Sequence, residues 1–384
     1  MVQKLSILAL LICFGFSTFA QDAYMNASSD DKEKIYLGGE AYKVKTFKQT
    51  FKTEKPKNII LMIGDGMGVT QVFSGLTANG GHLFLENCKH IGFSKTQAAD
   101  KYITDSAAGG TALATGVKTY NGGVSVDMNK KSLKTILESA EEKGLATGLV
   151  STSAITHATP ASFIAHQPER SMYEEIAADF LKTDIDVFIG GGRDHFMKRK
   201  DSLNLVEKLK ENGYRYEENM NSVKRVKKGK LAALVADVHL GRVAERGDML
   251  PVATKTAINI LSKNDKGFFL MVEGSQIDWG GHANSTIYIV EDMLDFDKAI
   301  GKALEFAAKD GETLIVVTAD HETGGMAITG GIMDKGVVKA GFPTKGHTAV
   351  MVPIFAYGPG AEEFIGIMEN TEVHDKMKKL LLGN

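Results

Sequence analysis

The sequence predicts an α/β protein with three layers, α/β/α, around a large and mostly parallel central sheet. Apolar runs alternate with helix-like segments along most of the chain, which is typical of parallel strands joined by helices. The runs at 58–63 and 267–272 are continuously apolar, as strands buried on both faces require. The chain of 384 residues is 43% hydrophobic, which is enough for a sizeable core.

The first 20 residues have the pattern of a signal peptide. Lys4 precedes an apolar run over 5–16, and small residues follow up to Ala20. Because this run is too short to cross a bilayer, we expect no membrane span in the mature chain. We expect an exported protein, periplasmic or secreted, with Cys88 as its single mature cysteine and no intrachain disulfide.

Residues 21–56 are polar and mixed, and we interpret them as a poorly ordered leader before the first strand. Residues 57–384 contain no internal repeat and no clean boundary, so we predict a single domain. The formal net charge is −2, and we interpret the charged runs at 198–201 and 224–230 as solvated faces or loops rather than binding patches. We therefore expect no nucleic-acid surface.

The elements of this domain are assigned from apolar patterning and stop signals. Apolar runs, most of which end at a glycine or an acid, predict strands at 58–63, 145–150, 186–189, 267–272, 314–317 and 350–357. Helical spacing of apolar or small residues predicts helices at 69–78, within 103–116, at 133–140, 172–181, 290–304 and about 377–382. Their alternation implies that the strands end along a common edge of the sheet.

The segment 103–116 places an acid and a serine side by side at the mouth of a predicted helix. Alanines and a leucine over 107–114 favour the helix, so Asp105 and Ser106 are expected at its N-terminus. Free backbone NH groups and the positive end of the helix dipole favour an anion beside Ser106. Ser106 is therefore a candidate nucleophile, although this stretch taken alone fits a capping serine better.

Carboxylates follow three of the predicted buried strands, at Asp65, Glu273 and Asp320. Because the carboxyl ends of parallel strands meet at one edge, these acids are expected to converge. Converging buried carboxylates repel one another unless cations compensate them. Three histidines, His282, His321 and His347, are expected nearby. The pattern as a whole indicates a metal site, although each residue alone could be an ion-pairing or core residue.

The ligand types indicate which metals fit. Mixed nitrogen and oxygen ligands suit zinc: Asp278, His282 and His347 form one set, and Asp65, Asp320 and His321 form another. The oxygen ligands Asp65, Thr159 and Glu273 suit magnesium with several waters. Two zinc ions about 4 Å apart are suited to phosphoryl transfer by an ionised Ser106. Arg170 has the planar fork to bind a terminal phosphoryl group, with Asp105 holding it in place.

The strings IGDGMG, TDSAAGGTALATG, THATP, EGSQIDWGGH, TADH and GHTA occur in this order over residues 58–360 and resemble alkaline phosphatase. The resemblance covers nearly the whole mature chain. It implies that phosphate monoesters are hydrolysed to an alcohol and inorganic phosphate through a phosphoserine at Ser106, with two Zn²⁺ and one Mg²⁺. By motif, it implies the zinc and magnesium sets named above, a phosphate contact at Arg170, and a possible homodimer.

Three features depart from the family pattern. Trp279 stands where many members carry Lys or His, which removes a water-mediated cationic contact to phosphate. His157 stands where some bacterial members have an acid, which removes one carboxylate from the magnesium site. The segment 325–347 is short, leaving little room for the surface insertion of some relatives.

Other functions account less well for the same residues. A sulfatase needs Cys or Ser at the first position of the string 166–170, which begins here with His166. A phosphodiesterase of the same superfamily would keep the zinc ligands but has no need of the Arg170 clamp. A non-catalytic exported metal- or phosphate-binding protein has no need of Ser106. The other loop histidines, His195, His239 and His374 with His166, are read as surface or hydrogen-bonding residues.

Overall fold

The structure is a computed structural model that describes residues 31–383, so the predicted signal peptide lies outside the described residues. Its centre is a ten-stranded sheet in the order β15 (Gly366–Glu369), β3 (His90–Lys95), β14 (Val352–Tyr357), β9 (Thr313–Thr318), β2 (Asn58–Gly64), β8 (Phe268–Gly274), β4 (Ala146–Ala154), β5 (Val187–Gly191), β7 (Leu231–Leu234) and β6 (Arg215–Glu217). Only β14 runs antiparallel to its neighbours in this sheet. The mostly parallel central sheet is therefore confirmed.

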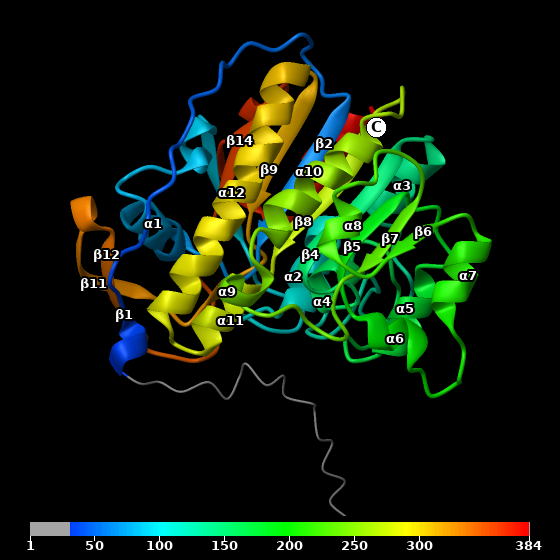
Figure 1. Cartoon of the computed structure of the whole chain (residues 1–384), viewed down its shortest axis with the longest axis horizontal. Coiled ribbons are helices and arrows are strands. Elements are labelled where there is room, and N and C mark those ends of the chain that lie inside the picture. Colours follow the sequence, from blue (N-terminus) through cyan, green and yellow to red (C-terminus); the bar gives the residue numbers. More distant parts are fainter. Residues whose placement is uncertain (1–30, 384) are drawn as a thin grey trace, which may run out of the picture.

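Helices cover both faces of this sheet (Figure 1). One core joins the sheet to α1 (Val69–Ala78), α8 (Met220–Val223), α10 (Met249–Leu261), α11 (Gln276–His282) and α12 (Thr286–Asp310). The other core joins it to α2 (Ser106–Thr115), α3 (Ile136–Glu142), α4 (Ala158–Ala161), α5 (Tyr173–Asp179), α6 (Arg193–Met197), α7 (Leu205–Glu211) and α13 (Asn370–Leu382). The three-layer prediction is confirmed. No helix within residues 31–383 combines the length and the apolar character that crossing a membrane requires.

Two small sheets complete the fold. One contains β1 (Ile35–Tyr36), β12 (Val337–Gly341) and β11 (Ala327–Ile332), and the other pairs β10 (Glu322–Thr323) with β13 (His347–Thr348). The first lies beyond α1 at one side of the molecule (Figure 1). The short segment after residue 325 therefore forms the β11–β12 hairpin and then continues through β13 to β14.

The register of the central strands brings their carboxyl ends together. Ile63 of β2 pairs with Glu273 of β8 on one side and with Thr318 of β9 on the other. Asp65 and Asp320 each follow two residues after these paired positions, so they leave the sheet beside Glu273. The expected convergence of three carboxylates at one edge is confirmed.

Residues 31–56 of the leader dock on the domain, in contrast to the interpretation of the leader as poorly ordered. The backbone of β1 pairs with β12, and the Tyr42 hydroxyl donates a hydrogen bond to Asp297 on α12 at 2.6 Å. The Tyr42 and Phe47 rings pack against Phe84, with ring centroids 5.8 and 6.4 Å apart. Aromatic residues at intervals give this polar segment enough apolar surface to dock on the domain.

A buried ion cluster connects the start of α11 with helix α12. Arg246, at the end of α9 (Val243–Arg246), donates to Asp292 at 2.6 Å and to Asp295 at 2.8 Å, and the three side chains are only 1–2% exposed. Its other nitrogen donates to Gln276, the first residue of α11, at 3.2 Å. This cluster helps to fix the start of the helix that carries Asp278.

Replacing Arg246 by methionine is expected to lower the free energy of unfolding by about 3–5 kcal/mol, because two buried carboxylates lose their cation. Arg242→Met is the matched control: its partner Glu291 is 3.3 Å away, and both side chains are about one-third exposed or more. The control should cost at most about 1 kcal/mol. Urea unfolding measures both, and equal losses would contradict the assigned role of the cluster.

Candidate active site

Ser106 is the first residue of α2 and lies at the edge where β2 and β9 end. Asp105 caps this helix: its Oδ1 accepts from the backbone NH of Ala108 at 3.0 Å and from that of Gly122 at 3.2 Å. Ser106 is only 2% exposed, and its Oγ lies 3.2 Å from His321 Nε2. The predicted helix N-terminus is therefore present, and Ser106 at this position contacts a histidine from a distant part of the sequence.

A first cluster joins α11 to β13. His282 Nε2 lies 3.3 Å from Asp278 Oδ2, His347 Nε2 lies 3.5 Å from Asp278 Oδ1, and the two Nε2 atoms are 3.2 Å apart. The Nδ1 atoms of both histidines contact backbone carbonyls, those of Lys345 at 2.5 Å and Thr104 at 2.8 Å. These contacts orient both Nε2 atoms toward Asp278, as in zinc sites whose histidines are held by outer hydrogen bonds.

A second cluster surrounds His321. Its Nε2 lies 3.4 Å from Asp65 Oδ1 and 3.3 Å from Asp320 Oδ2, and all three side chains are buried. The His321 and His347 ring centroids are 3.6 Å apart, so the first and second clusters are adjacent. Asp320 also packs against α2: a Cβ at Gly109 would lie 3.0 Å from the Asp320 Cβ, which explains the glycine.

A third cluster consists of Asp65, His157 and Glu273, each of which offers one ligand atom within 4.8 Å of the others. Thr159 at the start of α4 donates to Asp65 Oδ2 at 3.4 Å. Ser151 donates to Glu273 Oε2 at 2.6 Å and so orients this carboxylate. Asp65 is shared between the second and third clusters, as the sequence predicted.

Arg170 lies beside these clusters and is held by two contacts. One guanidinium nitrogen donates to Asp105 Oδ2 at 3.0 Å, and the other lies 3.2 Å from His157 Nε2. The Arg170 side chain is about one-quarter exposed, so it borders both solvent and the buried clusters. The structure therefore brings together the residues that the sequence analysis proposed as catalytic or metal-binding.

The electrostatics of the clusters fit cations. Burial, with the negative charge of Asp278, raises the pKa of Asp320 to about 8, and burial with Asp320 raises the pKa of Asp65 well above its usual range. Asp278 differs, because His282 outweighs the effect of burial and holds its pKa below the usual range. Within these clusters, three buried carboxylate oxygens have no hydrogen-bond partner: Asp65 Oδ1, Asp320 Oδ2 and Glu273 Oε1. These oxygens are placed to bind metal ions.

The metal-free protein is expected to lose stability as the pH rises from about 6.5 to about 8. Over this range the folded state keeps the proton on Asp320, whose pKa is raised to about 8, whereas the unfolded chain, with aspartate pKa values near 4, has released it. The raised pKa of Asp65 acts in the same direction. Each retained proton lowers the free energy of unfolding by about 1.4 kcal/mol per pH unit. Burial lowers the pKa values of His321 and His347, so their opposite contributions end near pH 6.5.

Urea unfolding of chelator-treated and zinc-loaded protein at several pH values between 6.5 and 8 measures this effect. Bound cations hold the carboxylates ionised, so the zinc-loaded protein should lack the decline. A chelator-treated protein whose stability is constant or rises over the same range would contradict the raised pKa of Asp320.

One side chain at the site, Thr323, was not singled out from the sequence, and His239 was read there only as a surface or hydrogen-bonding residue. The Thr323 hydroxyl donates to Asp278 and lies 3.2 Å from His321 Nδ1, so it contacts the first and second clusters. Thr323 could have been recognised in the sequence by its position two residues after the candidate metal ligand His321. His239 accepts from the backbone NH of Ala154 at 3.1 Å, which confirms a hydrogen-bonding role, and its ring centroid is 5.6 Å from that of His157.

Comparison with known proteins identifies the family. A family model of alkaline phosphatase matches residues 56–340 and 333–382. The chain belongs to the alkaline phosphatase family. Alkaline phosphatase 3 of Bacillus subtilis (strain 168) is 34% identical over 100% of this chain and 98% of that protein. The alkaline phosphatase of Escherichia coli (strain K12) is also 34% identical, over 86% of this chain and 87% of its own.

Solved alkaline phosphatases share the fold. The enzyme from the Antarctic bacterium TAB5 matches with a TM-score of 0.81 and 43% identity, over 86% of this chain and 99% of that one. A TAB5 mutant with a histidine replaced by aspartate, and with magnesium bound in its M3 site, matches equally well over 87% and 99%. Together with the three clusters, family membership makes this protein a metal-dependent phosphomonoesterase.

Proposed function

We propose that this alkaline phosphatase is exported and hydrolyses phosphate monoesters through a phosphoserine on Ser106. The observation that carries this proposal is the position of Ser106 Oγ, at a helix N-terminus and 3.2 Å from His321 in the second cluster. The signal-peptide pattern of residues 1–20 supports export.

The three clusters would hold two Zn²⁺ and one Mg²⁺, the first zinc by Asp278, His282 and His347, the second by Asp65, Asp320 and His321, and the magnesium by Asp65, Thr159 and Glu273. Bound zinc would lower the pKa of the attacking hydroxyl and stabilise charge on the leaving oxygen. Thr323 would keep Asp278 and His321 in place through its hydrogen bonds.

The protein's own groups would bind and orient the phosphoryl group. The first backbone NH groups of α2 point toward the mouth of the helix and favour a dianion beside Ser106. Arg170, held by Asp105, would bind two phosphoryl oxygens. The Oγ–P bond forms as the ester P–O bond breaks and the alcohol leaves. Water then attacks phosphorus, the Oγ–P bond breaks, and inorganic phosphate is released.

The experiment for this step is acid quenching during turnover of an aryl phosphate, followed by peptide mass spectrometry. The expected result is one phosphoryl group on the tryptic peptide that contains Ser106, present only while substrate or inorganic phosphate is supplied. Turnover with no phosphoserine in quenched samples would overturn the proposed intermediate and favour direct attack by water.

We infer that His157 weakens magnesium binding in the third cluster, because an imidazole there replaces a third carboxylate beside Asp65 and Glu273. The TAB5 mutant with magnesium in its M3 site carries the corresponding type of exchange, histidine to aspartate. His157→Asp is therefore expected to tighten Mg²⁺ binding at least about tenfold. Calorimetric titration with Mg²⁺ measures this change, and an unchanged dissociation constant would contradict it.

The broader proposals follow the family. The substrates are small phosphate monoesters, and a homodimer is proposed from the resemblance alone. A phosphodiesterase is not favoured, because the Arg170 fork is suited to the free oxygens of a terminal phosphoryl group.

A further inference from the structure

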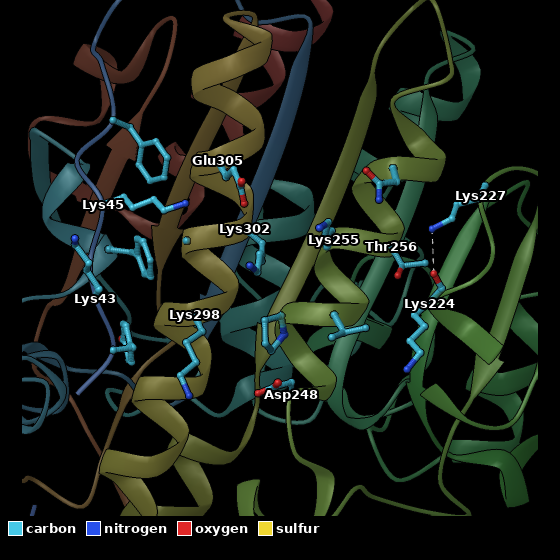
Figure 2. A pocket seen from close by; sticks show the side chains of 17 residues that line it. Lys43, Lys45, Lys224, Lys227, Asp248, Lys255, Thr256, Lys298, Lys302 and Glu305 are labelled. Atoms are coloured by element: carbon cyan, nitrogen blue, oxygen red, sulfur yellow. Dashed lines mark hydrogen bonds between the residues drawn. The ribbon is translucent and has the colours of Figure 1, made fainter. Parts of the chain in front are cut away.

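A groove of about 740 Å³ lies between α10, α12 and the leader segment 42–47, on the helical layer (Figure 2). Lysines line it from every side: Lys43 and Lys45 from the leader, Lys224 and Lys227 near the end of α8, Lys255 from α10, and Lys298 and Lys302 from α12. We call it the lysine groove. Two carboxylates, Asp248 and Glu305, are the acids among its lining residues.

The lining of the lysine groove carries an excess of positive charge. Seven lysines against two acids leave an excess of five positive charges in a chain whose formal net charge is −2. Among the described residues, none of these seven lysines has a carboxylate oxygen within 4.0 Å, whereas Lys182 elsewhere pairs with Asp179 at 2.6 Å. Lys224 and Lys227 donate only to neutral oxygens, at 2.9 and 3.2 Å. The missing counter-charges would be supplied by an anionic ligand.

The arrangement of the lysines favours a chain of anions over a single one. Lys298 and Lys302 are one helical turn apart, about 6 Å along the axis of α12. Lys45 extends from the leader toward this helix, and Lys255 lies across the groove on α10 (Figure 2). Lysine ammonium groups are mobile point charges without the fixed fork of arginine, which is absent from the lining. A flexible polymer with a charge on every unit fits this pattern.

The aromatic side chains of the groove argue against nucleic acid. Sites for single strands offer free aromatic faces on which bases stack. Here the Tyr42 and Phe47 rings pack against Phe84, and Phe84 in turn packs on Gly301, where a Cβ would lie 2.7 Å from its ring. The Lys298 ammonium lies 5.4 Å from the centre of the Tyr42 ring. Phosphates without bases therefore fit better.

We propose that the lysine groove binds linear inorganic polyphosphate. The groove is separate from the metal clusters, since Lys298 lies twelve residues, about 18 Å of helix axis, beyond the start of α12 next to α11. The proposal therefore goes beyond the phosphomonoesterase function and does not depend on Ser106.

The test is fluorescence anisotropy of labelled long-chain polyphosphate with the mature protein, with saturating orthophosphate present to occupy the active site. The groove variant carries Lys255→Gln, Lys298→Gln and Lys302→Gln. The control variant carries Lys131→Gln, Lys309→Gln and Lys379→Gln, which removes the same charge from exposed lysines outside the groove. Aryl phosphate hydrolysis should be unchanged in both variants, which shows that both are folded.

We expect the wild-type protein to bind polyphosphate with a strong dependence on salt. The groove variant should bind polyphosphate at least about tenfold more weakly than the wild-type protein. The slope of log K against log salt should be smaller in magnitude by about three, one for each lysine removed. The control variant should stay close to wild type. Equal losses in both variants, no loss in the groove variant, or no binding by wild type would overturn the proposal. So would equal or tighter binding of single-stranded DNA or anionic lipid vesicles through the same three lysines.

Discussion

Replacing Ser106 by alanine is expected to reduce kcat for an aryl phosphate by roughly 10³- to 10⁶-fold, the range seen when an enzyme loses its nucleophile. The mutation removes the Oγ atom that lies 3.2 Å from His321 and leaves the metal clusters in place. Zinc content, measured by elemental analysis, should therefore be unchanged. Initial rates over a range of substrate concentrations separate the loss of kcat from any change in KM.

Ser162→Ala is the matched control for this substitution. Ser162 is another buried serine close to α2, and its hydroxyl donates to Ala158 at 2.8 Å and to Ala107 at 3.3 Å without contacting a metal cluster. Its kcat should remain near that of wild type. If Ser106→Ala kept a rate within about tenfold of wild type, Ser106 would be a helix-capping residue, and the nucleophile would have to be water.

Replacing His282 by alanine is expected to remove one zinc ion and to reduce kcat by at least about 10²-fold, because a bound metal supplies several kcal/mol of charge stabilisation. His282 Nε2 lies 3.3 Å from Asp278 and 3.2 Å from His347 Nε2, so its loss opens the first cluster. Excess zinc should restore part of the activity, since Asp278 and His347 remain. Elemental analysis and initial rates with added zinc measure both effects.

His166→Ala is the control for His282→Ala. His166 is also a partly buried histidine, but its ring contacts Glu138 at 2.9 Å and the Ser125 carbonyl at 3.0 Å, away from the clusters. It should keep two zinc ions and wild-type kcat. Full zinc occupancy in His282→Ala would show that the first cluster is not a metal site.

The sequence was informative where buried strands end in chemically distinctive residues. The segments that form β2, β8 and β9 are continuously apolar, and an acid stands at or just after the end of each: Asp65, Glu273 and Asp320. The strands, the sheet edge at which they end and the cluster of acids at that edge could therefore be predicted together. The helix at Ser106 was predictable for a related reason. A capping acid precedes small residues, and Gly116 ends the helix with φ 73°.

Elements with weaker patterns escaped prediction. β7 lies in the apolar run 231–236, but half of that run is alanine, which is uncommon in strands. β3 carries charged and exposed side chains and forms no apolar run. Helix α10 contains Pro251 in its first turn and has no side-chain cap at its start. The predicted terminal helix at 377–382 is too short, because α13 begins at Asn370 and its first turns are mostly polar in sequence, although Asn370 and His374 are buried.

Contacts between distant segments also lay beyond sequence reasoning. Arg246 meets Asp292 and Asp295 only because α9 folds against α12, and nothing near it in the sequence marks a buried cation. His239 reaches Trp279, with ring centroids 4.9 Å apart, from a loop after β7. The lysines of the groove likewise come from four separate segments, each of which resembles an ordinary charged surface by itself.

The most direct test of a metal-dependent phosphomonoesterase compares an aryl phosphate monoester with the matched diester and sulfate at alkaline pH. Native, chelator-treated and zinc-restored protein are assayed side by side. We predict monoester turnover well above diester and sulfate turnover, its loss with chelator, and its return with zinc. Preference for the diester would contradict the assignment of Arg170, and absence of turnover by a protein that retains zinc would contradict the account as a whole.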